Sequence, residues 1–238
     1  MTSFVFDVDG TLTNARETID PVFEKFMQEF VTNNTCYICT GSDRSKTIEQ
    51  IGESLTNQFE LVFHCSGNHV YKGNTEYKKN NWQLSSEQYK FLEDALASSL
   101  YNEKTGNHIE QRIGSANFSI CGRNANFEQR QRYSTWEKQH QARKLISEQF
   151  NQKFGNTAEA LVAGETSIDI FKLGHNKGQA LDYIDDTVVF FGDKCFPGGN
   201  DWDIAKRSDV YHQIDNGWKQ TFEILKKQYH KTEIYEDQ

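Results

Sequence analysis

The chain has 238 residues, a formal net charge of −8 and 36% hydrophobic residues. The length suits one large domain or two modest ones, and the acidic balance argues against nonspecific binding to nucleic acid or to an anionic membrane. No apolar run approaches the ~20 residues that span a bilayer. We expect no signal peptide, because the N-terminus leads directly into an apolar strand. The five scattered cysteines favour buried thiols in a reducing cytoplasm.

The opening strand ends in two carboxylates. An apolar run at 4–6 leads into Asp7 and Asp9, and Gly10 ends the strand, so Asp9 is expected at the first bend, close to Asp7. Two carboxylates at the end of a buried strand are costly unless a cation lies between them, and Mg2+ suits such oxygen ligands. A strand followed by an acidic turn would explain D-x-D alone, but D-x-D-G-T-L-T at 7–13 is far more specific.

Helix and strand signals alternate up to about residue 74. The predicted elements are a helix that Asp20 caps, a strand over 35–40, a helix with Ile48, Ile51 and Leu55 on one face, and a strand over 61–64. This order predicts an α/β fold, a parallel sheet with helices on both faces. Ligands bind such sheets at the carboxyl ends of the strands, where Asp7, Asp9, Thr40 and Ser42 fall.

The pattern changes beyond residue 74. The predicted elements are a helix over 85–100, strands over 109–113 and 117–121, a long polar helix over 126–150, and strands over 158–163 and 166–172. Strands beside strands, with helices to one side, suggest an inserted α+β unit. Alternation resumes after 174 with a helix that carries Lys177, strands over 187–191 and 210–214, and a final helix. We therefore expect a core from 1–74 and 174–238 and an insert from 75–173, with a polar tail at 231–238 that frays.

A second acidic strand end follows the insert. The strand over 187–191 leads into Gly192-Asp193 and a Gly-rich loop that ends at Asp201. Taken alone, Gly-Asp after a strand is an ordinary turn. Paired with the opening motif on a neighbouring strand, it completes an acidic pocket for one Mg2+ ion.

Two hydroxyl residues and one pair of polar strand residues are further candidates. Thr40 and Ser42 lie before a helix, where backbone N–H groups favour an anion, although an ordinary N-cap explains them equally well. Ser167 and Asp169 share one face of a strand. A hydroxyl beside a carboxylate suits the hydroxyls of a sugar, but an exposed sheet face would explain the pair too.

Three arginines of the insert are candidates for an anion site. Arg112, Arg123 and Arg130 surround a Gly-rich segment, and guanidinium groups bind phosphate through a planar fork. For arbitrary arginines, ordinary surface charge is the better explanation.

The motifs resemble those of haloacid-dehalogenase-type (HAD) phosphotransferases, and most of the chain is similar to the eukaryotic-type phosphomannomutase family. The similar segments are D-V-D-G-T-L-T with Arg16, G-S-D at 41–43, S-G-N-H-V-Y-K-G-N at 66–74, the three arginines, the S-x-D strand, and F-F-G-D-K-x-x-P-G-G-N-D at 190–201. The resemblance implies a HAD-like Rossmannoid core with an inserted α+β cap. It also implies a homodimer formed through the cap.

The resemblance also implies roles for individual residues. Asp7 would be the nucleophile, Asp9 the general acid/base, and Lys177 the lysine that neutralises the phosphoryl oxygens. Asp7 and Asp193 would bind Mg2+ through their side chains, Asp9 through its backbone carbonyl, and Asp201 as a further acid. In the family, the substrate is contacted by arginines matching Arg16, Arg112, Arg123 and Arg130, and by residues matching Ser167 and Asp169. The chain departs from the family at 204–208, so we carry over no second metal site.

We therefore expect a Mg2+-dependent hexose-phosphate mutase. It would interconvert mannose 6-phosphate and mannose 1-phosphate through an aspartyl-phosphate and a hexose bisphosphate, and the preference for mannose over glucose stays open. The first alternative is a sugar-phosphate phosphohydrolase on the same scaffold, which shares every core residue. The second is a catalytically silent sugar-phosphate sensor, which the intact Asp7, Asp9 and Asp193 disfavour.

Overall fold

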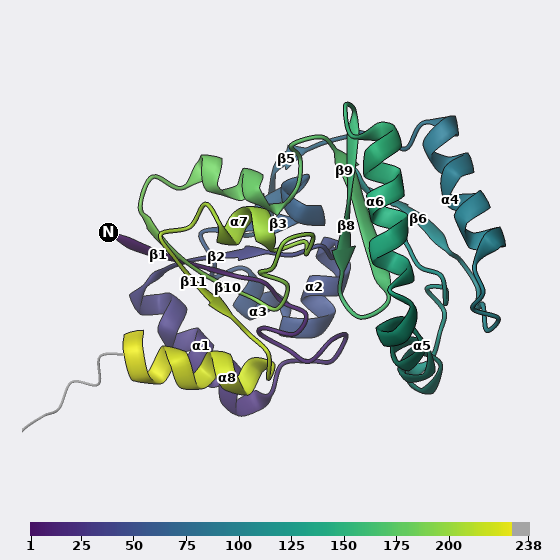
Figure 1. Cartoon of the computed structure of the whole chain (residues 1–238). Coiled ribbons are helices and arrows are strands. Elements are labelled where there is room, and N and C mark those ends of the chain that lie inside the picture. Colours follow the sequence, from purple (N-terminus) through teal and green to yellow (C-terminus); the bar gives the residue numbers. More distant parts are fainter. Residues whose placement is uncertain (230–238) are drawn as a thin grey trace, which may run out of the picture.

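A computed structural model describes residues 1–229, and the chain forms two sheets with their own helices (Figure 1). The larger sheet has the strand order β11-β10-β1-β2-β3-β4-β5. Its strands are β1 (Thr2–Phe6), β2 (Thr35–Cys39), β3 (Leu61–His64), β4 (His69–Lys72), β5 (Thr75–Lys79), β10 (Thr187–Gly192) and β11 (Val210–Gln213). The strands from β11 to β3 are parallel, as the alternating sequence predicted, and β4 and β5 are antiparallel.

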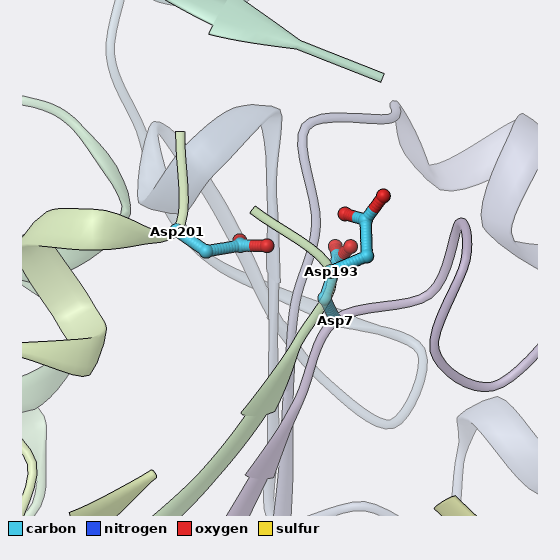
Figure 2. Close-up of side chains that lie close together, drawn as sticks. All are labelled: Asp7, Asp193 and Asp201. Carbon is cyan, nitrogen blue, oxygen red and sulfur yellow. The ribbon is translucent and has the colours of Figure 1, made fainter. Parts of the chain in front are cut away.

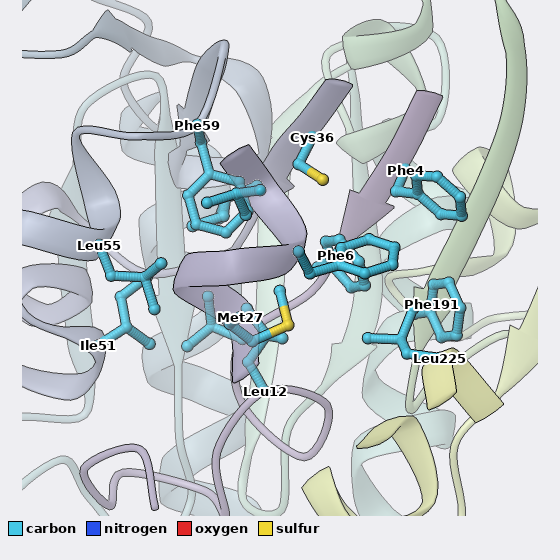
Figure 3. Close-up of a cluster of buried hydrophobic side chains, with 14 of the residues drawn as sticks. Phe4, Phe6, Leu12, Met27, Cys36, Ile51, Leu55, Phe59, Phe191 and Leu225 are labelled. Atoms are coloured by element: carbon cyan, nitrogen blue, oxygen red, sulfur yellow. The ribbon is translucent and has the colours of Figure 1, made fainter. Parts of the chain in front are cut away.

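Helices cover both faces of the larger sheet because β1 alternates its side chains between two cores. Phe4 and Phe6 join a cluster formed with α1 (Pro21–Asn33), α2 (Arg44–Ile51), α3 (Glu53–Thr56) and α8 (Trp218–Ile224), part of which Figure 3 shows. Val5 points to the opposite face. There it joins residues of the 3-10 helix η2 (Lys177–Tyr183) and of α7 (Trp202–Ala205). The stacked rings of Phe6 and Phe191, with centroids 5.1 Å apart, tie β1 to β10.

The smaller sheet is antiparallel and has the order β6-β7-β9-β8. Its strands are β6 (Ile109–Arg112), β7 (Ser115–Phe118), β8 (Ala158–Ala163) and β9 (Ser167–Lys172). It packs with α4 (Ser86–Ser98), α5 (Phe127–His140) and α6 (Ala142–Phe154) around a separate apolar cluster that includes Phe118, Tyr133 and Phe150. Figure 1 shows these helices at the end of the molecule farthest from α1 and α8.

Three elements differ from the sequence-based expectation. The sequence assigned 75–79 to the insert, but β5 pairs with β4 through a tight hairpin and extends the larger sheet. The helix expected over 126–150 is two helices, because Gln141 adopts a left-handed backbone with φ 48°. The helix through Leu55 likewise breaks at Gly52, whose φ is 78°. The tail at 231–238, expected to fray, lies outside the described residues.

The two sheets meet through main-chain hydrogen bonds beside the loop after β10. Val162 N donates to Gly198 O at 3.0 Å, and Asn200 N donates to Val162 O at 3.1 Å. These bonds join β8, an edge strand of the smaller sheet, to the segment that ends at Asp201. Among residues 1–229 no helix is long and apolar enough to cross a membrane. All five cysteines are buried and free.

Candidate active site

Three carboxylates converge at the carboxyl edge of the larger sheet. Because β1 and β10 run parallel and Phe6 pairs with Phe191, Asp7 and Asp193 emerge at the same edge. Asp201 approaches from the start of α7 (Figure 2). Each residue offers one carboxylate oxygen, and these oxygens lie within 4.8 Å of one another. The fold thus brings together the two residues expected as side-chain ligands, Asp7 and Asp193, and the further acid, Asp201.

Lys177 lies between two of these carboxylates. Its Nζ donates to Asp7 Oδ1 and to Asp201 Oδ1, both at 2.6 Å, and its side chain is only 1% exposed. Asn176 caps η2 through a bond from Gly178 N and thereby places Lys177 at the first residue of that helix. Burial lowers the pKa of Lys177, but Asp201 and Asp7 raise it more, so the ammonium stays charged.

The acidic cluster still needs positive charge. Burial, together with Asp201 and Asp193, raises the pKa of Asp7 well above its ordinary value in spite of Lys177. Burial also raises the pKa of Asp193 to about 6, although Lys194 pairs with its Oδ2. A divalent cation with oxygen ligands would relieve this excess, and Mg2+ fits the donor set of Asp7, Asp193 and Asp201. Asp201 Oδ2 already accepts a bond from Lys194 N at 2.9 Å.

Asp9 lies beside this cluster and its side chain is held separately. Its Oδ1 accepts bonds from Arg16 N at 2.7 Å and from Gln50 Nε2 at 2.8 Å. Ser42 Oγ donates to Oδ2 at 3.4 Å. The carboxylate of Asp9 is not a member of the three-residue acidic group found among residues 1–229. Its side chain is therefore available for proton transfer.

The hydroxyls after β2 do not cap the next helix. The N-cap of α2 is Asp43, whose Oδ1 accepts a bond from Lys46 N at 2.8 Å. Thr40 is buried, and its Oγ1 accepts a bond from Ser42 N at 3.1 Å. The N-cap explanation for Thr40 and Ser42 is therefore wrong, and both residues line the cleft above the acidic cluster.

The insert closes the other side of a cleft of about 270 Å³. The sequence-predicted residues that line this cleft are Asp7, Asp9, Arg16, Thr40, Ser42, Arg112, Arg123, Arg130, Ser167, Asp169 and Asp193. Lys177 and Asp201 lie at its floor, buried behind Asp7. The cleft is the place where the two sheets face each other, and all the candidate residues from the sequence gather around it.

Two guanidinium groups of the insert, those of Arg112 and Arg123, are anchored by hydrogen bonds and ion pairs, and all three arginines line the cleft. Arg112 donates to Gly41 O at 2.9 Å and pairs with Glu110, which also pairs with Arg123 at 3.0 Å. The close approach at Gly41 requires a residue without a side chain, because a Cβ there would lie 2.8 Å from Asp169 Oδ2. Arg112 therefore connects the insert directly to the loop after β2.

Three arginines face each other across the cleft. Burial lowers the pKa of Arg16, and the neighbouring charges of Arg123 and Arg130 lower it further. Arg130 Nε is buried without a hydrogen-bond partner among the residues described. An anion with several oxygens would offset these like charges and could accept a bond from the unsatisfied donor. The three arginines and the acidic cluster line opposite sides of the same cleft.

Ser167 and Asp169 face the cleft from β9, the central strand beside β8. Ser167 Oγ accepts a long bond from Arg123 at 3.5 Å, and Asp169 Oδ1 accepts one from Asn117 Nδ2 at 2.7 Å. Both residues are buried. An exposed sheet face, the alternative explanation for this pair, is therefore wrong.

Sequence reasoning missed four polar residues of the site. They are Gln50, which contacts Asp9, Glu110, which holds two arginines, Asn117, which contacts Asp169, and Asn200, which lines the cleft. Glu110 could have been found, because it shares a strand face with Arg112 two residues later. Gln50 gave no such signal, since one Gln on an amphipathic helix looks like a surface residue.

Comparison with known sequences identifies similar proteins along most of the chain. The sequence pattern of the family described as "Eukaryotic phosphomannomutase" matches residues 23–231. A "Probable phosphomannomutase" of Caenorhabditis elegans is 34% identical over 235 residues, which cover 90% of this chain and 90% of the relative. The phosphomannomutase of Spinacia oleracea is 34% identical over 93% of this chain and 94% of its own.

Solved structures share the fold at much lower identity. An IMP-bound IMP-nucleotidase mutant from Plasmodium falciparum has a TM-score of 0.66 at 13% identity, over 94% of this chain and 67% of its own. A HAD subclass IIB sugar phosphatase has a TM-score of 0.58 at 13% identity, over 94% of this chain and 91% of its own. The chain therefore shares its fold with this nucleotidase and this sugar phosphatase.

Proposed function

The chain belongs to the eukaryotic phosphomannomutase family, and from that premise we propose that it interconverts mannose 6-phosphate and mannose 1-phosphate. The reaction would pass through an aspartyl-phosphate on Asp7 and a hexose bisphosphate. One observation supports this most: a single cleft has the acidic cluster at its floor and a cluster of arginines on the other side. A sugar with two phosphates needs both clusters, because one phosphate reacts at the acidic cluster while the arginines hold the other.

Asp7 attacks the phosphorus in the first step. Its Oδ1 is held by Lys177, which leaves Oδ2 for the attack and places an ammonium beside the phosphoryl oxygens. Asp9 protonates the sugar oxygen as its bond to phosphorus breaks. The donor in this step is the hexose bisphosphate, which departs as a hexose monophosphate. In the second step Asp9 accepts a proton from the free hydroxyl of a hexose monophosphate, and that oxygen takes the phosphoryl group from Asp7, which forms the bisphosphate again.

We propose Mg2+ as the cofactor, held by the side chains of Asp7 and Asp193 and by the backbone carbonyl of Asp9. When bound, Mg2+ offsets charge on the phosphoryl oxygens. Asp201, both of whose oxygens accept bonds from Lys177 and Lys194, would act on the ion through water. The raised pKa values of Asp7 and Asp193 support this assignment.

The insert would hold the second phosphate and exclude water. Arg16, Arg123 and Arg130 suit the distal phosphate, with Arg112 beside them, and Ser167 and Asp169 suit hydroxyls of the sugar ring. Thr40 and Ser42 lie nearer the reacting phosphate. Exclusion of water matters because hydrolysis of the aspartyl-phosphate would turn a mutase into a phosphatase. The hexose bisphosphate would then reverse its orientation within the closed cleft.

We further propose that the insert beyond β5, residues 80–173, is a movable cap on the core, and that β5 belongs to the core sheet. A homodimer through the cap is supported by exposed apolar side chains on its helices and loops, such as Leu100, Phe127 and Leu145. Sedimentation or light scattering would measure it. A cytoplasmic location is supported by the five free, buried thiols.

The decisive experiment supplies mannose 1-phosphate, Mg2+ and a trace of hexose bisphosphate. We expect mannose 6-phosphate as the main product and its complete loss in Asp7→Asn. Steady release of inorganic phosphate without isomerised product would instead favour the phosphohydrolase, the alternative function on the same residues. Glucose 1-phosphate in the same assay measures the sugar preference.

A further inference from the structure

Gln50 is a buried polar residue with contacts that the mechanism does not yet use. It lies on the inner face of α2, where Thr47 and Ile51 are also buried, and it is 1% exposed. Its Nε2 donates to Asp9 Oδ1 at 2.8 Å and to Thr13 Oγ1 at 3.2 Å. Its backbone carbonyl accepts a bond from Ile19 N at 2.7 Å. The residue therefore reaches the loop after β1 at three points.

The orientation of the Gln50 amide follows from its partner. A carboxylate oxygen is only an acceptor, so the amide must present its NH2 group to Asp9. The opposite end of the amide, Oε1, is buried without a hydrogen-bond partner among residues 1–229. An apolar side chain would pack at this position without leaving such an atom. The hydrogen bond that the NH2 group donates to Asp9 therefore explains why Oε1 is left unsatisfied.

The two donors at Asp9 both reach the same oxygen. Arg16 N and Gln50 Nε2 point at Oδ1, whereas Oδ2 accepts, from the part of the chain that the structure describes, only the long bond from Ser42 Oγ at 3.4 Å. An oxygen that already accepts two N–H bonds is a poor place for a proton. The carboxylate therefore presents Oδ2 as the oxygen that can exchange a proton with a substrate.

The same contacts fix the loop that carries Arg16. This residue has a left-handed backbone, with φ 65°, and its N–H reaches Asp9 Oδ1 in that conformation. Gln50 holds the same loop at Thr13 and at Ile19. One buried side chain therefore orients the acid/base and supports the backbone of a proposed phosphate ligand.

We propose that Gln50 is a positioning residue that holds Oδ1 of Asp9, so that Oδ2 transfers the proton to and from the sugar oxygen. The inference rests on the proposed function only for the role of Asp9 as acid and base. In the step concerned, the O–P bond to the sugar breaks, the bond from Asp7 to phosphorus forms, and the proton on Asp9 Oδ2 moves to the departing sugar oxygen.

The test compares two leaving groups in Gln50→Met, which keeps the length of the side chain and removes the donor. The first substrate is the hexose bisphosphate, whose sugar oxygen needs a proton to depart. The second is nitrophenyl phosphate, whose phenolate departs without one. For both we would measure the first phosphoryl transfer to Asp7 in a single turnover with Mg2+. We expect transfer from the hexose bisphosphate to slow by about tenfold or more, and the burst of nitrophenolate to change by less than about threefold.

The matched control is Thr47→Val, which removes a buried hydrogen bond of the same helix without touching Asp9. It should leave both rates within about twofold of the wild type. Equal slowing of both substrates in Gln50→Met, or the same selective loss in Thr47→Val, would overturn the proposal. If Gln50→Met does not fold, Gln50→Leu makes the same comparison, because it also removes the donor and adds no charge beside Asp9. Because the first transfer is measured, a failure of the isomerisation assay would leave this test intact.

Discussion

Asp193 offers the sharpest test of the acidic cluster in the metal-free protein. Burial, followed by the charge of Asp201, raises its pKa from the ordinary value of 3.8 to about 6, against the opposing effect of Lys194. Its side chain is 18% exposed, so solvent screens it only weakly. The perturbation we choose is Asp193→Asn, which removes the charge and keeps the shape.

The size and sign of the effect follow from proton linkage. Between pH 3.8 and about 6 the folded state binds more protons at Asp193 than the unfolded state does. The stability of the metal-free protein therefore falls as the pH rises through this window. At 1.36 kcal/mol per pKa unit, the loss attributable to Asp193 is about 2–3 kcal/mol, complete above the folded pKa. Mg2+ bound at the cluster would cancel this loss.

The assay is urea unfolding at a series of pH values from 4 to 7, first with chelator and then with Mg2+. We expect Asp193→Asn to be more stable than the wild type by about 2–3 kcal/mol at pH 7 in chelator and to match it near pH 4. Mg2+ should stabilise the wild type increasingly as the pH rises, and should stabilise the variant far less. Asp94→Asn, at an exposed carboxylate of α4, is the control and should show neither effect.

Two results would refute this reasoning. One is a variant no more stable than the wild type at pH 7 in chelator, which would mean that the carboxylate is adequately neutralised without metal. The other is equal stabilisation of both proteins by Mg2+, which would place the ion elsewhere.

Three further changes test other parts of the structure. Lys177→Met leaves Asp7 and Asp201 buried and unpaired, so denaturation in chelator should show a loss of about 3–5 kcal/mol; an unchanged midpoint would contradict the ion-pair geometry. Arg130→Ala removes charged hydrogen bonds to the distal phosphate, so isomerisation should fall by about tenfold to a hundredfold. Hydrolysis of a small phosphate ester, assayed in parallel, should change far less, and equal losses would count against the role of Arg130. Gln141→Gly should stabilise the protein by up to about 1 kcal/mol in thermal unfolding, because the left-handed backbone between α5 and α6 suits glycine; destabilisation would show that the Gln side chain contributes more than this strain.

Local signals predicted much of the fold. Asp20 accepts bonds from Val22 N and Phe23 N, and Ser85 forms a capping box with Gln88, so both helices begin where the sequence indicates. Such caps depend on side chains a few residues away, which a sequence displays directly. The parallel strands followed from alternation with helices, and the comparisons confirm the α/β fold.

Other features depend on distant contacts or on backbone choices that residue type does not reveal. Gln141 breaks a helix although glutamine is a good helix former, because the left-handed conformation there lets the chain turn from α5 into α6. Gln50 and Asp9 are far apart in sequence, and only the fold of the loop after β1 brings them together. The charged groups of the site could be predicted from residue type and position in the sequence. The neutral groups that orient them could be found only from the three-dimensional structure.

The junction at Val162 is made wholly from peptide groups, so its contact does not depend on which side chains stand there. The side chains at this junction can therefore change during evolution while the hydrogen bonds between β8 and the loop are kept. A proline at this position is the exception, because it has no N–H group to donate. Val162→Pro would remove one of the two hydrogen bonds to the loop. It would not disturb the hydrogen bonds between β8 and β9, because the N–H and C=O groups of Val162 point away from β9. Asp201 lies one residue beyond the point of attachment, and thus a backbone lesion in the smaller sheet would reach the acidic cluster of the larger one.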